Sequence, residues 1–220
     1  MVEISYKYFV PFTGWTLIQR RGQYGNPPDF FSSKLWDDYV QGFGEPTKGN
    51  TVLEFDVIFP EFWLGLETMS NITSSGTWEL MVELEDFQNK SYIAVYHRFR
   101  VESSPLYRLS ISGYDTAASS LADSLNGGNE KHNGQAFSTS DRDNDKWVKN
   151  CAEQYLGAWW YDSCHNSNLN GYNYNRGDLP HESPRYYAKG IIWKNEANVA
   201  EQDHYFSWPK AEMKIRKKGC

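Results

Sequence analysis

The feature that most constrains the fold of this chain is a long segment, from about residue 115 to about residue 190, without periodic apolar residues. It consists mostly of Gly, Asn, Ser, Asp and aromatic residues. Loops this long inside a compact domain are usually functional, and they need more than backbone hydrogen bonds to fix their conformation. We therefore expect a metal ion and a disulfide bond to hold this segment.

The residues before this segment alternate between apolar and polar, which is typical of half-buried β-strands. We expect strands over residues 14–21, 77–86, 91–100 and 107–113. Between the first two, serines precede apolar residues at helical spacing within residues 30–40, and glycines follow. This pattern predicts a short helix with a serine as its N-terminal cap. A length of 220 residues suits one large domain.

The charge balance argues against nucleic acid as a partner. The net charge is -6, and the one basic cluster is residues 214–218, which we interpret as a solvated terminus. The sequence contains no run of about eighteen apolar residues, the length that a membrane-spanning helix needs, so we expect no membrane insertion. The chain also lacks a nucleophile elbow, an HExxH motif and a P-loop, and we predict that it is not an enzyme.

Three cysteines indicate an oxidising compartment. Cys151 and Cys164 are close in sequence and lack the CxxC and His spacing of a zinc site, so we predict a local disulfide and a secreted protein. A disulfide would leave Cys164 without a thiolate for catalysis with the adjacent His165. Cys220 has no obvious partner: it is free, paired with another chain in an oligomer, or incidental to where the sequence ends.

Two acceptor sequences for N-glycosylation support the same compartment. They begin at Asn71 and Asn89, which we predict as glycosylation sites. The first twenty residues lack a basic region followed by an apolar region, the pattern of an export signal. If the protein is secreted, the sequence is therefore that of a mature or trimmed chain.

The sequence DRDNDKW, residues 141–147, places three carboxylates at alternate positions. Hard oxygen ligands at this spacing suit calcium. The segment is not an EF-hand loop, which needs Gly at its sixth position and Glu at its twelfth, where this chain has Lys146 and Ala152. On this segment alone, a calcium site and a solvated acidic turn both remain open.

Several segments follow one another between Gly14 and Arg216: GWTLIQRR, EFWLGLE, WELMVELEDF, YRLSISGY, FSTSDRDNDKW, NCAEQYLGAWWYDSCHNSNLNGYN and EMKIR. In this order they resemble the fibrinogen C-terminal domain family, which includes ficolins, tachylectins, angiopoietins, tenascins and the globular ends of fibrinogen. The resemblance implies an α+β fold over residues 1–220. Its parts would be an N-terminal subregion of about 1–50, a central twisted antiparallel sheet at about 51–115 with few short helices elsewhere, and a loop-rich calcium and ligand subregion at about 116–220.

The resemblance also implies a set of calcium ligands. They would be the side chains of Asp143 and Asp145 and the main-chain carbonyls of Trp147 and Lys149, with waters completing the shell. Asp141 would then have a supporting role. The pair Cys151 and Cys164 matches the family's disulfide next to this loop.

A pocket for acetylated groups is the third implication. In several family lectins the peptide bond before the second cysteine, here Ser163–Cys164, is cis and turns main-chain amides towards the ligand. Aromatic rings would enclose the acetyl methyl group while those amides donate to the acyl oxygen. Trp159 and Trp160 are expected in the core instead. The implied ligand-binding residues are Tyr155, Ser163, Cys164, His165, Tyr187, His204 and Tyr205.

These residues favour a calcium-stabilised, lectin-like domain whose partners are acetylated glycans or other acetylated small groups, in a role such as innate immunity. One alternative is the peptide-binding function of fibrinogen, which needs carboxylates where this chain has Tyr155 and Ala188. Another is a receptor-binding or extracellular-matrix module of the angiopoietin or tenascin type, which binds a cell-surface or matrix protein. The Arg-Gly-Asp tripeptide at 176–178 adds little to it, since tripeptides recur by chance.

Overall fold

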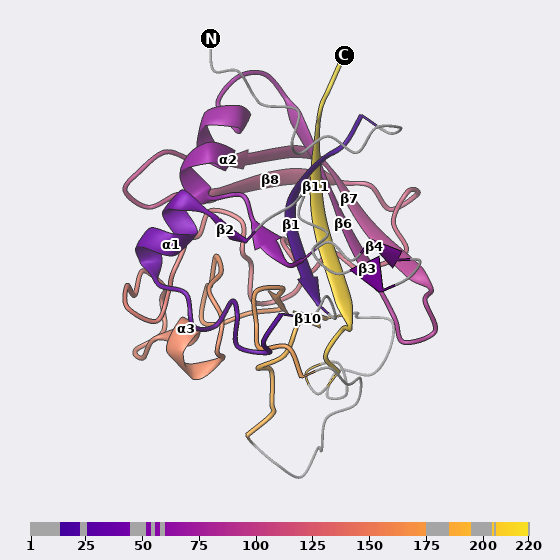
Figure 1. The fold of residues 1–220 in the computed structure, drawn as a ribbon. Helices are drawn as coiled ribbons and strands as arrows, with labels where there is room; N and C mark the ends of the chain where they lie inside the picture. Colours follow the sequence, from indigo (N-terminus) through magenta and orange to yellow (C-terminus); the bar gives the residue numbers. More distant parts are fainter. Residues whose placement is uncertain are drawn as a thin grey trace.

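Figure 1 shows the chain as a computed structural model. The structure describes residues 14–22, 26–44, 60–174, 185–194, 204 and 206–219, and the backbone of 52–53 and 56–57. Three features of the sequence lie outside the described residues: the predicted ligand residue Tyr205, the tripeptide at 176–178, and Cys220.

Within the described residues, seven strands form one antiparallel sheet in the order β2-β5-β1-β11-β6-β7-β8. The four strands expected from alternating residues are confirmed as β1, β6, β7 and β8. The sheet contains β1 (Thr16–Gly22), β2 (Phe43–Gly44), β5 (Phe62–Trp63), β6 (Trp78–Glu85), β7 (Ser91–Val101), β8 (Leu109–Tyr114) and β11 (Lys210–Lys217).

The last strand, β11, corrects the interpretation of the basic tail as a solvated terminus. It runs through the middle of the sheet between β1 and β6, as Figure 1 shows. Ile215 is fully buried on one face. On the other face, Lys214 pairs with Glu83 at 2.5 Å and Arg216 with Glu79 at 2.6 Å. Its basic residues are therefore the polar half of an alternating strand, neutralised by carboxylates on β6.

Two short helices, α1 (Trp36–Gln41) and α2 (Leu66–Thr73), pack against each other. The predicted helix within 30–40 exists, but it begins later and the predicted serine cap is wrong. Residues 28–33 form turns instead, which place the Phe31 ring edge-to-face on Phe43 at 4.8 Å. Carboxylates cap α1: Asp38 accepts from the Leu35 amide and Asp141 from the Trp36 amide. The helix α2 was not expected from the sequence.

The predicted glycosylation sites are both exposed. Asn71 lies on α2, and Asn89 lies in the turn between β6 and β7 with a φ of 60°. Asn tolerates this left-handed conformation better than most residues do. Their modification stays a prediction.

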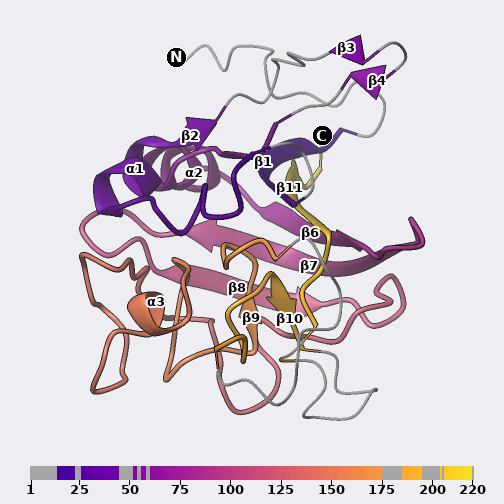
Figure 2. The same cartoon turned by 60° about the horizontal axis from the view of Figure 1, so that its bottom comes forward.

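The loop-rich part contains α3 (Cys151–Gln154) and the pair β9 (Ser167–Asn168) and β10 (Ile192–Trp193); β3 (Val52–Leu53) and β4 (Asp56–Val57) form another pair. In the view of Figure 2, α1 and α2 lie above the strands β6 to β8, and α3, β9 and β10 lie below them. Trp159 and Trp160 join this part to the core and are fully buried, as expected. The indole of Trp160 donates to the Tyr107 carbonyl at 2.7 Å.

Candidate functional site

The acidic loop brings two of its three carboxylates together. One oxygen of Asp145 accepts from the Trp147 amide and the other from the Cys151 amide, both at 2.9 Å. Asp143 accepts from the Asp145 amide at 3.1 Å. Burial raises the pKa of Asp145 to about 6, and the neighbouring charge of Asp143 adds to this rise. A bound cation would relieve this repulsion, so the donor set fits calcium.

The third carboxylate, Asp141, does not join this pair. It accepts from the Trp36 amide at 2.9 Å and from the Thr139 hydroxyl at 2.7 Å. Its role is the supporting one that the resemblance implies, since it joins the loop to α1. Among the described residues no group of three or more His, Cys, Asp or Glu side chains could hold a metal ion. A calcium ion here would therefore need main-chain carbonyls and waters as well, and the carbonyls of Trp147 and Lys149 stay the predicted ones.

The loop is fixed on both sides. The Asn144 side chain donates to the Phe137 carbonyl at 2.8 Å, and the Lys146 amide donates to the Asp162 carbonyl at 2.9 Å. The predicted disulfide is confirmed, with an S–S distance of 2.06 Å between Cys151 and Cys164. A loop of this size gains roughly 3 kcal/mol from such a bond in the chain-entropy model. The disulfide and the Lys146 contact both connect the acidic loop to residues 162–165.

The expected cis bond at Ser163–Cys164 is wrong. The one cis peptide bond in the described part of the chain is Ser104–Pro105. The Ser163 amide donates to a carboxylate oxygen of Glu130 at 3.1 Å, and the Asp162 amide donates to the Cys164 carbonyl at 2.9 Å. With trans peptide bonds, the amides of Ser163 and Asp162 thus both have hydrogen-bond acceptors. A cis peptide bond before a residue other than proline would cost about 3 kcal/mol.

Four of the predicted ligand residues come together as a cluster of rings. Tyr155 packs edge-to-face on His165 with 4.8 Å between ring centroids, and Tyr187 lies 5.0 Å from His204. The two histidine rings stack at 6.1 Å. Tyr187 is 40% exposed and His165 only 5%, so the cluster extends from the surface into the interior. We call these four residues the aromatic cluster.

The histidines of the aromatic cluster carry polar atoms that the described residues do not satisfy. Neither ring nitrogen of His165 or His204 has a partner with hydrogen-bond geometry, although the Ala188 backbone lies near the His165 ring. Burial lowers the pKa of His165 well below its usual value and lowers that of His204 to about 4. Both rings are therefore neutral at physiological pH. A buried polar group without a partner is unusual, and a ligand would supply one.

A family model described as the C-terminal globular domain of fibrinogen beta and gamma chains matches residues 11–218. This chain belongs to the fibrinogen C-terminal domain family. Among solved structures, the domain is similar to the fibrinogen-like globe domain of human ANGPTL6, with a TM-score of 0.73, 34% identity, and coverage of 94% of this chain and 79% of that one. Lamprey fibrin D-dimer in complex with the peptide Gly-His-Arg-Pro-amide gives a TM-score of 0.76 at 30% identity, over 94% and 62% of the two chains.

Two curated relatives of this fibrinogen C-terminal domain are longer proteins. Techylectin-5A of Tachypleus tridentatus is 40% identical over 92% of this chain and 59% of its own length. Human tenascin-R is 42% identical over 92% of this chain and 12% of its own length. The chain therefore spans less than two thirds of either relative. These relatives are named as a lectin, a tenascin and a fibrinogen-like globe domain, none of them an enzyme, which agrees with the prediction that this domain is not one. None of its described helices is long and apolar enough to cross a bilayer.

Sequence reasoning missed one residue that positions the site of this fibrinogen C-terminal domain. His132 is fully buried, and its Nδ1 lies 2.7 Å from the Trp160 carbonyl, to which it donates. Its Nε2 accepts from the amides of Asn166 and Ser167 at 3.2 and 3.1 Å. This imidazole fixes the backbone directly after His165. A lone histidine in a polar loop carries no periodic signal by which it could have been found.

Proposed function

We propose that this domain is a secreted, calcium-stabilised recognition module that binds acetylated groups such as N-acetylated sugars. The observation that carries the proposal is the buried His165, whose ring nitrogens have no hydrogen-bond partner among the described residues, beside the rings of Tyr155 and the half-exposed Tyr187. A small group with one apolar end and one polar end suits such a site. The identity to techylectin-5A, a lectin by its name, supports a sugar as the ligand.

The charge of the aromatic cluster favours a neutral ligand over a cationic peptide. Both histidines are uncharged, because burial lowers their pKa values. Tyr155 and Ala188 occupy positions where the resemblance to fibrinogen leads us to expect carboxylates. A cationic peptide, like the one bound to lamprey fibrin, would find no opposite charge at those two positions.

Calcium would act on the site indirectly. Held by Asp143 and Asp145, the ion would order the acidic loop, which the disulfide joins to Cys164 and therefore to the adjacent His165. No atom of the ligand needs to touch the metal in this arrangement. Calcium binding and ligand binding would then stabilise the same set of loops.

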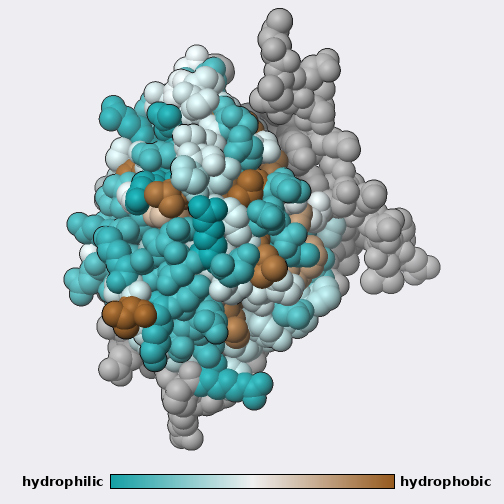
Figure 3. Space-filling model, turned by 90° about the vertical axis from the view of Figure 1, so that its left-hand side faces the viewer, coloured by the Kyte–Doolittle hydropathy of each residue, from teal (hydrophilic) through white to brown (hydrophobic). Residues whose placement is uncertain are grey.

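A protein-binding role like that of a matrix module is the second candidate, because the identity to tenascin-R is as high as that to techylectin-5A. Figure 3 shows the face that carries α1, α2 and α3 as mostly hydrophilic, with hydrophobic residues scattered singly among the described ones. Large docking surfaces more often show a continuous apolar patch. This face therefore gives the second candidate less support than the aromatic cluster gives the first.

Calorimetric titration with N-acetylglucosamine and with glucosamine tests the proposal, since the two sugars differ by the acetyl group. We expect binding of N-acetylglucosamine alone in the presence of calcium. The variant Tyr187→Ala should weaken it about three- to tenfold, the range for loss of one aromatic contact. Phe87→Ala is the matched control, because both side chains are 40% exposed. Equal binding of both sugars, or of neither to the calcium-loaded domain, would contradict acetyl recognition.

A further inference from the structure

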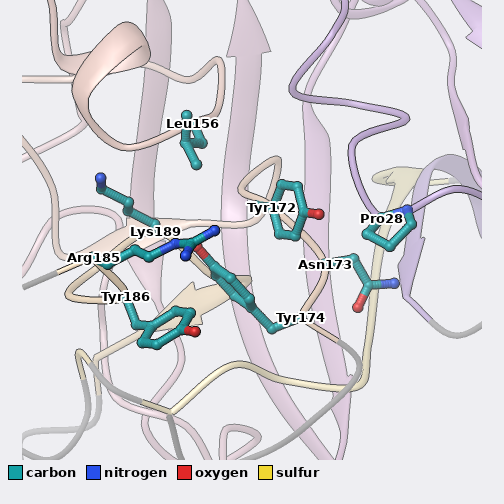
Figure 4. Close-up of a pocket in the computed structure, with 8 residues that line it drawn as sticks. All are labelled: Pro28, Leu156, Tyr172, Asn173, Tyr174, Arg185, Tyr186 and Lys189. Carbon is teal, nitrogen blue, oxygen red and sulfur yellow. The ribbon is translucent and has the colours of Figure 1, made fainter. Parts of the chain in front are cut away.

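A second pocket, of about 470 Å³, is lined by residues other than those of the aromatic cluster (Figure 4). Its wall is formed by two chain segments, residues 172–174 and 185–189, with Pro28 and Leu156 completing the rim. The two sites are neighbours along the chain. Tyr155 and Tyr187 belong to the aromatic cluster, whereas the adjacent Leu156 and the residue before Tyr187 line this pocket.

The pocket is held in shape by its backbone. The Tyr172 amide donates to the Lys189 carbonyl at 2.9 Å, which joins its two segments. Directly beside this bond, a Cβ atom on Gly171 would lie only 2.0 Å from the Gly190 carbonyl oxygen, so only glycine permits the approach. The buried Asn173 fixes the remaining side, because its amide donates to the Pro28 carbonyl at 3.0 Å. A ligand would therefore meet a preformed cavity.

Three tyrosines supply most of the ring surface of the pocket. The rings of Tyr172 and Tyr174 lie 4.7 Å apart, and those of Tyr174 and Tyr186 lie 5.4 Å apart. All three are half-buried, so their faces are partly open to solvent. Burial raises the pKa of Tyr174 to about 12, and its phenol stays a neutral hydrogen-bond donor at physiological pH. Rings of this kind pack on the C–H faces of sugars while phenols bond to hydroxyls.

Two cations give the pocket its charge. Figure 4 shows the guanidinium of Arg185 near the middle of the pocket, beside the Tyr174 ring, with Lys189 along the same wall. Within the described residues neither cation forms an ion pair, whereas Lys210, Lys214 and Arg216 each pair with a glutamate. A chain of net charge -6 has carboxylates to spare, yet none neutralises this pocket among those described. The site thus favours an anion.

We propose that this pocket is a second binding site, and that its ligand is a saccharide carrying a carboxylate or a sulfate. The planar guanidinium of Arg185 would bond to two oxygens of the anionic group, and Lys189 would add a further charge. The tyrosine rings would cover the sugar ring. An acidic peptide suits the pocket less well, because the Tyr172 amide and the Lys189 carbonyl are already bonded to each other and not free to pair with a peptide backbone.

Titration of the whole chain with glucuronic acid, glucose 6-sulfate and glucose at low salt tests this inference. None of these sugars has an acetyl group, so the outcome is independent of the aromatic cluster. We expect both anionic sugars to bind and to shift the amide NMR signals of residues 172–174 and 185–189, and glucose to bind at least tenfold more weakly.

The double variant Arg185→Gln and Lys189→Gln should lose roughly tenfold or more in affinity for both anionic sugars. Its control is Arg100→Gln with Lys90→Gln, which removes the same two charges from exposed residues on and beside β7. Unchanged unfolding temperatures would show that all variants are folded. Equal binding of glucose, equal losses in both double variants, or an equal response to a tetraglutamate peptide would overturn the proposal, as would no binding of either anionic sugar.

Discussion

Replacing Glu61 by Gln is expected to destabilise the domain by about 3–5 kcal/mol, because the change leaves a buried guanidinium without its counter-ion. Arg21 and Glu61 are both fully buried, and Nε of Arg21 lies 3.1 Å from the carboxylate. Burial disfavours both charges: it lowers the pKa of Arg21 and raises that of Glu61, while each partner's charge opposes the shift. The free energy of unfolding, measured by urea denaturation, reports the loss.

A surface ion pair provides the control for this prediction. Glu85 pairs with Lys210 at 2.5 Å, but both side chains are partly exposed, so Glu85→Gln should cost about 1 kcal/mol or less. The double change Arg21→Met with Glu61→Leu should recover much of the loss, because it removes both buried charges. Equal costs for Glu61→Gln and Glu85→Gln would show that burial does not set the strength of the Arg21 pair.

The Arg21 pair matters for binding as well as for stability. Nη2 of Arg21 donates to the Gly171 carbonyl at 2.6 Å, and so connects β1 to the segment that lines the second pocket. The Gly22 amide donates to Glu61 at 2.7 Å. Loss of the pair should therefore loosen the ligand loops as well as the sheet edge.

Acidification from pH 6.5 towards pH 4 is expected to destabilise the domain, with His132 as a main cause. Burial lowers the pKa of His132 to about 4 in the folded chain, whereas an exposed histidine in the unfolded chain titrates near 6.5. Between pH 6.5 and pH 4 the unfolded chain therefore binds more protons than the folded chain. The contribution of neutral His132 to the free energy of unfolding is complete above pH 6.5 and is lost as the pH falls from 6.5 towards 4. The difference corresponds to roughly 3 kcal/mol for this one group.

Urea unfolding at pH 7, 5.5 and 4.5 measures this effect. Wild type should lose stability steeply across the series. His132→Gln should be less stable at pH 7, since the amides of Asn166 and Ser167 lose their acceptor, but its loss with falling pH should be smaller. The partly exposed His97 serves as control, because His97→Gln retains His132 and therefore the steep decline. A wild type equally stable at all three pH values would refute the argument.

The sequence predicted β1, β6, β7 and β8, in which apolar residues alternate with polar ones inside the chain. It did not predict β11, because Lys214 and Arg216 made the end of the chain resemble a charged tail, and only pairing with Glu79 and Glu83 on β6 shows them as the outer face of a strand. The start of α1 was also missed. One of its two capping carboxylates, Asp141, is distant in sequence, and the other, Asp38, lies inside the helix and not before it.

The candidate site also has features that the sequence could predict and features that it could not. The disulfide was predictable because its two cysteines are close in sequence, whereas the choice of Asp143 and Asp145 as calcium ligands came from the resemblance to a family. The contact between His165 and His204 depends on tertiary structure, and only the resemblance to a family pointed to it. The role of His132 depends on backbone groups that it meets only in the folded chain, and the second pocket depends on the approach of residues 172–174 and 185–189, which no sequence pattern shows.

The most direct test of the central claim is titration of the domain with N-acetylglucosamine in calcium and after chelation, with metal removal verified by elemental analysis. We expect chelation to lower both the unfolding temperature and the sugar affinity, the latter by about tenfold, which is within the usual range for coupling between two sites. Asp145→Asn should behave in calcium like the chelated protein, and Glu153→Gln, which removes a nearby exposed charge, like wild type. Unchanged affinity in the metal-free protein would contradict a pocket supported by calcium.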